Sequence, residues 1–487
     1  MGMQQRSELP EGWVSVPLGD LISPSREKIE PSDTPDLKYV GLEHIEANTC
    51  RIISSGIASD AKSTKTRFRI GDVLYGKLRP YLNKVCIPEF EGICSTDIIV
   101  FNKQPNLNNR YLMHFLSTPE FVDYANNNMS GVQLPRISYQ KISSFRIPLP
   151  PLAEQHRIVA AIEALFARLD AVEARLDRVP CIVQQFREAV LAAACDGRLT
   201  EDWREEHSEV EDAHRLLLDI ARSIQKTNSS RKYHKINPEE LSDIPKTWKW
   251  TQLGCLLNLT SGIAFKKSEY SQQGVKLLQI ANVTFGKIIW EKQAFLPDNY
   301  VEKYPDLVLK SGDLLMALNR PLLGDNLKIA FLSDEDEPAI LYQRVGRFDF
   351  YCTDLKKYIY TFLNSPLFIE ELRTDLRGVD QPFITKPNLL SKKISLPPLP
   401  EQHEIVRRVD ALLALADQIE AKVAAAKERT EALRQSILAQ AFSGQLVPTE
   451  AELARREGRE YEPAAVLLER ITAEQNHLSG RRASSPM

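Results

Sequence analysis

Basic and aromatic side chains alternate in one short stretch of the chain, between residues 60 and 84, and similar residue types recur in the second half. Guanidinium and ammonium groups interleaved with aromatic rings suit contact with phosphates and with the edges of a nucleic-acid groove. The same composition is also common on a solvated protein surface, so both interpretations stay open. The candidate contact residues are Lys62, Lys65, Arg67, Arg69, Lys77, Arg79, Lys84, Gln133, Arg136, Lys266, Lys267, Arg320, Arg344, Arg347, Gln381 and Lys386.

The two glutamines in this set lie in the sequences GVQLPRISYQ and GVDQPFITKP, which start at Gly131 and Gly378. A glutamine amide can form two hydrogen bonds with adenine in the major groove. Gln133 and Gln381 do not occupy matched positions in the two sequences, however. A structural turn rich in Gly and Pro would explain the same residues, so this alternative also stays open.

Motifs for catalysis, nucleotide binding and metal binding are missing from the sequence. The stretch Gly71–Lys77 resembles a phosphate-binding loop, but Leu78 stands where such a loop needs Ser or Thr, and Arg79-Pro80 follows instead of a helix. Seven cysteines are scattered without a C-x-x-C pair. The acidic run from Asp334 to Glu337 is expected to be a solvated loop. The sequence therefore predicts a protein with no metal and no cofactor of its own.

The composition is that of a globular protein, with 487 residues, 43% hydrophobic side chains and 62 basic against 65 acidic groups. No apolar stretch reaches the length of a membrane span, and the first residues do not resemble a secretory signal. The scattered cysteines fit a reducing compartment. We expect a cytoplasmic protein.

An internal repeat organises the chain. LPPLAEQHRIV begins at Leu149 and LPPLPEQHEIV begins at Leu396, and nine of these eleven positions are identical. The same offset matches YLMHFLSTPEF at Tyr111 with YIYTFLNSPLF at Tyr358, and GVQLPRI with GVDQPFI. A match that keeps its register over such a distance indicates a tandem duplication. Each copy has a variable front and a similar back.

Both backs predict long helices. Apolar residues after each proline pair are spaced alternately four and three apart, which is the heptad pattern of a coiled coil. Each helix should be about 65 Å long, at 1.5 Å per residue over about 43 residues. Pro180 predicts a kink or break in the first helix. The predicted seam comprises Ile158, Ile162, Leu165, Leu169, Val172 and Leu176 in the first helix and Ile405, Val409, Leu412, Ile419 and Val423 in the second.

The simplest arrangement is that the two helices pack together as an antiparallel pair, and the alternative is that separate short hairpins form within each half. The fronts mix short strand-like runs with one helical piece each, at 109–124 and 355–372, which predicts α+β domains. The predicted division is a first front at 1–148, a first spacer helix at 149–199, a connector at 200–244, a second front at 245–395, a second spacer helix at 396–446 and a C-terminal connector and tail at 447–487.

Two variable fronts, each followed by a P-L-P-P-L-x-E-Q-like junction and a long helix, resemble the specificity subunit of type I restriction–modification systems. The residues that carry the resemblance are Leu149–Val159, Leu396–Val406, Gly197–Leu199 and Gly444–Leu446. The resemblance implies a fold of two α+β target recognition domains separated by a pair of long antiparallel coiled-coil helices, with pseudo-two-fold symmetry. It also implies a subunit without catalysis that reads a split DNA site.

The partners implied by the resemblance are double-stranded DNA, two methylase subunits and restriction subunits. S-adenosylmethionine would be bound by the methylase subunits, which methylate adenine N6, while ATP and magnesium would serve the restriction subunits. The similar segments 213–220 and 464–471 are candidate docking sites for the methylases. The net charge of −3 predicts weak DNA binding by this chain alone.

A different class of protein is also compatible with the repeat: a tandem scaffold whose fronts bind protein partners. Gel-shift assays with and without a methylase partner would separate the two. The segment 481–485 at the end of the chain is expected to be disordered.

Overall fold

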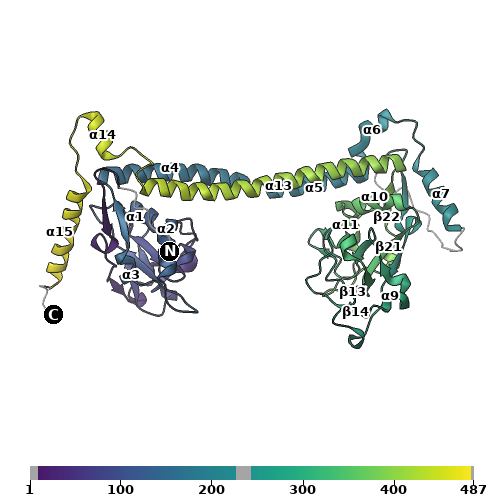
Figure 1. Ribbon diagram of the computed structural model, residues 1–487, viewed down its shortest axis with the longest axis horizontal. Coiled ribbons are helices and arrows are strands. Elements are labelled where there is room, and N and C mark those ends of the chain that lie inside the picture. The colour runs from purple at the N-terminus through teal and green to yellow at the C-terminus, as the bar shows by residue number, and fades with distance from the viewer. Residues whose placement is uncertain (1–8, 226–242, 484–487) are drawn as a thin grey trace. The chain divides into compact units, whose positions relative to one another are not determined.

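The computed structural model describes residues 9–225 and 243–483, and it divides the chain into two units (Figure 1). Unit 1 combines Met1–Asp177 with Ala424–Met487, and unit 2 is Arg178–Val423. Each unit contains one mixed head of strands and helices and parts of the long helices. The predicted α+β class is therefore confirmed for both halves of the repeat.

The head of unit 1 contains three small sheets. A two-stranded antiparallel sheet joins its two ends, a three-stranded sheet has the order β7-β6-β9, and a five-stranded sheet has the order β2-β5-β8-β3-β4. The strands are β1 Val14–Pro17, β2 Lys28–Ile29, β3 Lys38–Val40, β4 Gly56–Ile57, β5 Lys65–Phe68, β6 Val73–Gly76, β7 Val85–Cys86, β8 Gly92–Cys94, β9 Ile98–Phe101 and β10 Arg146–Leu149. The helices are α1 Asn109–Leu116, α2 Pro119–Asn127 and α3 Tyr139–Ser144.

The head of unit 2 follows the same plan. A two-stranded sheet pairs β11 with β22, two four-stranded sheets have the orders β12-β21-β16-β19 and β14-β13-β20-β15, and β17 pairs with β18. The strands are β11 Lys249–Gln252, β12 Leu257–Ser261, β13 Val275–Leu278, β14 Phe295–Leu296, β15 Val308–Leu309, β16 Leu314–Ala317, β17 Leu322–Leu323, β18 Asn326–Leu327, β19 Ile329–Phe331, β20 Ala339–Leu341, β21 Val345–Phe350 and β22 Lys393–Leu396. The helices are α8 Leu253–Leu256, α9 Tyr300–Lys303, α10 Lys356–Leu363, α11 Pro366–Thr374 and α12 Lys386–Leu390.

Matched residues build the helical part of both heads. The hydroxyl groups of Thr118 and Ser365 accept backbone N–H groups at the starts of α2 and α11, which satisfies donors that the helix itself leaves free. A proline follows each cap in the first helical position, where its missing N–H costs nothing. The buried Tyr111 donates its hydroxyl hydrogen to the carbonyl of Pro148, and Tyr358 does the same to Ser395. The repeat therefore encodes one packing arrangement twice.

The long helices follow the heads. The first is divided into α4 Leu152–Leu176 and α5 Val179–Asp196, and Pro180 lies in the first turn of α5. The predicted break is thus confirmed. The second, α13 Leu399–Phe442, runs without interruption for 44 residues. Its first part belongs to unit 2 and its last part belongs to unit 1.

Ion pairs show how the long helices run inside each unit. In unit 1, Lys427 of α13 pairs with Asp177 just after α4, and Arg434 pairs with both Asp170 and Glu173. Residue numbers fall along α4 as they rise along α13, so the two helices are antiparallel. In unit 2, Arg187 of α5 donates to Asp417 and Glu420 of α13. The predicted antiparallel pairing is confirmed, and α4 and α13 lie side by side in unit 1 (Figure 1).

The predicted seam residues differ in burial along the helices. Ile158 and Ile162 of α4, and Ile405 and Val409 of α13, are buried against the heads. The residues further along are half-buried at Leu165, Leu169, Leu176, Leu412, Ile419 and Val423, and Val172 is 44% exposed. The apolar contact is therefore concentrated where the helices meet the heads, and charged pairs supplement it along the rest of their length.

Two shorter helices complete each unit. Unit 2 has α6 Glu201–Glu206 and α7 Ala213–Gln225, and unit 1 has α14 Glu450–Glu457 and α15 Ala464–Ala483. The first amides of α7 and α15 donate to the carbonyls of Thr247 and Gly12, at equivalent places of the two heads. Both candidate docking segments thus use one face to cover their own head. Of the tail segment 481–485 that was expected to be disordered, residues 481–483 form the end of α15, so the expectation is wrong for them, and Ser484 and Ser485 lie outside the described residues. Among the residues described, none of the helices is long and apolar enough to cross a lipid bilayer.

Candidate nucleic-acid interface

A loop with unusual backbone geometry follows β6 in unit 1 and β16 in unit 2. In unit 1 it covers residues 77–84, and in unit 2 it covers 318–328; we call both the Arg-Pro loop. Arg79 and Arg320 have φ angles of 52° and 47°. Each arginine precedes a proline at the matched position of the repeat. Left-handed φ angles are uncommon for residues other than glycine and tend to occur where function requires them.

A second loop lies beside the first in each head. It covers residues 130–136 in unit 1 and 377–383 in unit 2, and we call both the Gly-Val loop. Ser130 and Arg136 exchange two backbone hydrogen bonds of 2.9 Å, and Arg377 and Phe383 exchange two of 3.0 and 2.9 Å. The loop is therefore a closed, hairpin-like turn in both heads.

Backbone hydrogen bonds fix the two loops of unit 1 to one another. The amide of Arg79 donates to the carbonyl of Pro135 at 2.8 Å, and the amide of Ile137 donates to the carbonyl of Lys77 at 3.0 Å. The amide of Lys77 donates in turn to the carbonyl of Asp97 at 2.9 Å. Three segments distant in sequence thus meet at one place.

The same three bonds recur in unit 2. The amide of Arg320 donates to the carbonyl of Pro382 at 2.6 Å, that of Ile384 to Leu318 at 3.0 Å, and that of Leu318 to Arg344 at 2.8 Å. The duplication has therefore preserved the backbone frame of this loop pair. Of the candidate residues, the frame brings together Lys77, Arg79, Gln133 and Arg136 in unit 1 and Arg320, Arg344 and Gln381 in unit 2.

The side chains on the common frame are different in the two heads. In unit 1, Arg136 donates from Nε and Nη2 to the two carboxylate oxygens of Asp97, at 2.7 and 3.3 Å. This hydrogen bonding raises the pKa of Arg136. In unit 2, Arg344 takes the place of Asp97 and Phe383 takes the place of Arg136. The two heads therefore present different donors, acceptors and rings on one backbone frame.

The sequence did not single out Asp97 or Arg377. A search for basic and amide groups passes over an aspartate, although Asp97 orients Arg136. Arg377 closes the Gly-Val loop of unit 2 and is exposed. It lies just ahead of the repeated Gly-Val pair, so the alignment of the two copies was the signal that could have found it.

The other candidates in unit 1 lie on or beside β5, away from the loop pair in the chain, except Lys84, which is the last residue of the Arg-Pro loop. Lys62 is exposed, while Lys65 is 9% exposed and donates to the hydroxyl of Ser63 at 2.7 Å. Arg67 and Arg69 both pair with Glu27, and Arg67 also pairs with Glu91. Lys84 ends the Arg-Pro loop, but its ammonium donates to the carbonyl of Leu42 at 2.6 Å. Most of these charges have partners within the head.

The remaining candidates lie in unit 2. Lys266 and Lys267 are exposed beside a short turn, and Lys386 is exposed in the first turn of α12. Arg347 on β21 donates to Asp349 at 2.8 Å and to the carbonyl of Val308 at 3.1 Å. Lys386 follows the Gly-Val loop closely in the chain, whereas the other three are distant from it in sequence.

The glutamate of each E-Q-H junction anchors its head to the long helix. Glu154 is buried and accepts hydrogen bonds from the indole of Trp13 at 2.9 Å and from the amide of Glu450 at 2.8 Å. Burial raises the pKa of Glu154, although these donors oppose the shift. Glu401, 1% exposed, accepts from Trp248 at 2.8 Å and from Arg204 at 2.6 Å. The repeat thus uses a tryptophan–glutamate pair twice.

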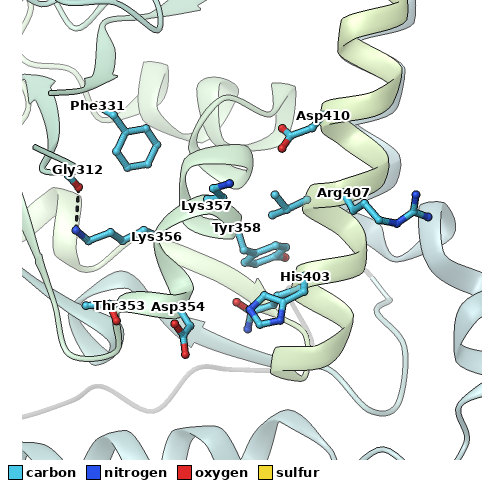
Figure 2. Close-up of a pocket in the computed structure, with 12 residues that line it drawn as sticks. Gly312, Phe331, Thr353, Asp354, Lys356, Lys357, Tyr358, His403, Arg407 and Asp410 are labelled. Atoms are coloured by element: carbon cyan, nitrogen blue, oxygen red, sulfur yellow. Dashed lines mark hydrogen bonds between the residues drawn. The ribbon is translucent and has the colours of Figure 1, made fainter. Parts of the chain in front are cut away.

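A groove of about 770 Å³ lies between α10 and the start of α13 in unit 2 (Figure 2). Lys357, His403 and Asp410 lie along it (Figure 2). At the matched place in unit 1, Arg110 pairs with Glu163. None of the candidate contact residues lines this groove. The loop pair is therefore the better candidate site. Within residues 9–225 and 243–483, no three His, Cys, Asp or Glu side chains are grouped so that they could hold a metal ion.

Comparison with known proteins decides the family. The family model described as the type I restriction modification DNA specificity domain matches residues 10–180 and 245–426, which include both loop pairs. The chain belongs to this family of specificity subunits.

Similar specificity subunits match across most of their lengths. The MjaVIII specificity subunit of Methanocaldococcus jannaschii is 31% identical over 428 residues, which cover 86% of this chain and 91% of that protein. The EcoKI specificity subunit of Escherichia coli K12 is 30% identical over 508 residues, which cover 98% of each chain.

Solved structures agree with the fold. The HsdS subunit of Thermoanaerobacter tengcongensis superposes with a TM-score of 0.57 at 23% identity, covering 91% of this chain and 99% of that one. A chain from a study of assembly and conformational transition in the type I R-M system gives a TM-score of 0.63 at 22% identity, covering 90% and 100%. These likenesses support the fold of two mixed heads, each followed by a long helix.

Proposed function

We propose that this specificity subunit reads a bipartite DNA site, with one half read by the loop pair of each head. The observation that carries the proposal is the shared backbone frame with different side chains. Arg136, oriented by its two hydrogen bonds to Asp97, would read one half of the site, and Arg344 would read the other. An arginine can form two hydrogen bonds with guanine, and a well-placed pair of this kind is worth about 1–3 kcal/mol of discrimination.

The proposed recognition domains are residues 1–148 and 245–395, and the proposed spacer helices are 149–199 and 396–446. The segments 200–244 and 447–487 would connect them. The paired helices would set the gap between the two halves of the site. What supports this is that α13 is one uninterrupted helix with a part in each unit. A helix of this length spans about 66 Å at 1.5 Å per residue.

The chain would act without catalysis, in the cytoplasm, as part of a larger assembly. Two methylase subunits would carry S-adenosylmethionine and methylate adenine N6, and restriction subunits would use ATP and magnesium to cleave unmethylated DNA. The chain itself would need no cofactor. Methylases would dock on the outer faces of the long helices and on α7 and α15. Because the chain has a net charge of −3, we expect the partners to supply much of the attraction to phosphates.

Methylome sequencing tests the reading proposal. Cells expressing the chain with its methylase partners should show a bipartite adenine motif. Arg136→Ala should relax one half of that motif, and Arg344→Ala should relax the other. Arg110→Ala is the matched control, because Arg110 is exposed but pairs with Glu163 outside the loop pair. A motif that stays intact in both loop variants would refute the assignment.

A length change tests the role of the helices. Removing seven residues from α13 and seven from α4 keeps the heptad phase and shortens each helix by about 10 Å. The unread gap of the motif should then shrink by about three base pairs, at about 3.4 Å per base pair. A motif with an unchanged gap would mean that the helices do not set the spacing.

A further inference from the structure

The tip of each Gly-Val loop carries a valine that is almost completely exposed. Val132 is 100% exposed and Val379 is 98% exposed, and both occupy the same position of the repeat. Single apolar residues on a surface are normal. A valine that contacts nothing in its own chain adds nothing to folding, however, so packing does not explain why both copies have one at the same tip.

The backbone that carries each valine is sterically constrained. Gly131 and Gly378 precede the valines with φ angles of 99° and 88°, which side chains with a Cβ rarely adopt. A Cβ at either glycine would also lie 3.2 Å from a carbonyl oxygen across the loop. The closing backbone pairs hold the base of each loop, and a β-branched valine has little freedom at χ1. The tip can therefore press against another surface with little loss of conformational entropy.

Guanidinium groups lie beside both tips, together with two carboxylates: Asp97, which pairs with Arg136, and the exposed Asp380, which directly follows Val379. Arg79 lies on the adjoining Arg-Pro loop of unit 1, and Arg136 closes the Gly-Val loop itself. In unit 2, Arg377 closes the loop, and Arg320 donates from Nη2 to the carbonyl of Asp380 at 3.2 Å, directly after the valine. An exposed valine, joined in unit 1 by Leu134 at 50% exposure, lies among guanidinium groups and matches a surface with anions outside and apolar faces inside. A DNA duplex, with phosphates outside and stacked bases within, has this chemistry.

The reading positions differ between the heads, but the valine does not. A residue that is the same in both heads is suited to a feature that every duplex shares. We infer that Val132 and Val379 are wedges that enter between adjacent base pairs of each half-site and open the stack there. Apolar side chains inserted in this way unstack a step and kink the duplex by about 20–90°. The inference rests on the proposed function and adds a step that deforms DNA to the steps that read it.

Fluorescence of 2-aminopurine tests the wedges in the assembled complex with its methylase partners. The base replaces each adenine of a duplex in turn, on the motif that methylome sequencing defines, and its fluorescence rises when its stacking is lost. A methylase flips its target adenine out of the duplex, so a rise at that adenine is expected with or without a wedge. Apart from the target adenines, the wild-type complex should raise the signal at one position in each half-site. Val132→Ser should remove the signal in the half read by unit 1 only, and Val379→Ser should remove the signal in the other half only.

Binding to a weakened duplex provides a second readout. Each serine variant should lose about tenfold in affinity for the intact duplex, because opening the stack is no longer offset by apolar contact. A mismatch at the opened step should restore most of that loss. Ile53→Ser is the matched control, since Ile53 is 61% exposed and lies outside the loop pair, and it should change neither readout.

The outcomes separate the wedge from the proposed function. If the wild-type complex binds its motif but raises the fluorescence at no position other than the target adenines, or if both wedge signals persist in both variants, the wedge is wrong while the reading proposal stands. A changed preference at a T·A pair with both signals intact would mean that valine contacts a thymine methyl instead. If the wild-type complex binds the motif no better than a scrambled duplex, the proposed function itself is wrong.

Discussion

His114 should make the stability of unit 1 depend on pH. It lies on α1, is 4% exposed, and has no hydrogen-bond partner for either ring nitrogen among the described residues. Its ring packs edge-on against Phe166 of α4, with ring centroids 5.8 Å apart, and the guanidinium of Arg434 of α13 lies over the Phe166 ring, 5.1 Å from its centroid. Burial, reinforced by the charge of Arg110, lowers the pKa of His114 to about 4.

The sign and size of the effect follow from linkage. In the unfolded chain the pKa of a histidine is about 6.5. Below that pH, His114 is protonated in the unfolded state but stays neutral in the folded state until the pH approaches 4. The folded state therefore loses stability as the pH falls from about 6.5 to about 4. The loss reaches about 2 kcal/mol at pH 5 and about 3 kcal/mol below pH 4, at about 1.36 kcal/mol per pH unit.

The second half of the chain supplies the matched variant. Thr361 occupies the position of His114 in unit 2, where it is buried and donates to the carbonyl of Lys357 at 3.0 Å. His114→Thr should lower the stability of unit 1 at pH 8, because the smaller side chain leaves a cavity. It should also remove the extra loss between pH 6.5 and 4. Other groups that titrate, such as Glu154, remain in both proteins, so their effects cancel in the comparison.

Labelling with 5-fluorotryptophan gives an assay for each unit. Trp13 is the one tryptophan of unit 1, and the other four lie in unit 2. Urea titrations followed by the fluorine resonance of Trp13, at pH 8, 6 and 5, should show the loss in the wild type and not in His114→Thr. Equal pH dependence of the two proteins at Trp13 would refute the reasoning, as would a loss confined to the resonances of unit 2.

Two further predictions each compare a pair of variants. Glu401→Gln should lower the free energy of unfolding in urea by about 3–5 kcal/mol, because it leaves Arg204 without its buried partner. Glu154→Gln should lower it by about 1–3 kcal/mol, because the nearest donors to Glu154 are neutral. Equal losses in the two variants would contradict this. Gly444→Ala should destabilise unit 1 by well over about 1 kcal/mol, because its added Cβ would lie 2.3 Å from a proline ring. Gly458→Ala, also left-handed but with nothing within 4 Å, should cost only about 1 kcal/mol in thermal unfolding.

Much of the architecture could be predicted from local patterns. The alternating steps of four and three residues predicted the long helices, and Pro180 predicted the division between α4 and α5. Both signals depend on neighbours within one or two helical turns, so no knowledge of the fold is needed to see them. The repeat predicted that both halves share one arrangement, because equal sequences bury equal faces.

The sequence was less informative about the interface. It marked the basic residues on and beside β5 together with those of the loop pair, because composition does not reveal which charges have partners. Only the structure shows that Glu27 pairs with Arg67 and Arg69, while Arg79 remains at the surface of its loop. Charge neutralisation depends on contacts between strands that are distant in sequence.

The sequence by itself determined the number of heads, their mixed class, the long helices and the place where the first of them breaks. Tertiary structure alone decided that Lys77, Asp97 and Pro135 meet at one frame, and that the last segment of the chain packs on the first head through Ala464 and Gly12. The physical reason is the distance along the sequence over which each kind of interaction acts. Helical periodicity and proline act over a few residues, whereas the pairing of short strands and loops depends on backbone groups that become neighbours only after folding.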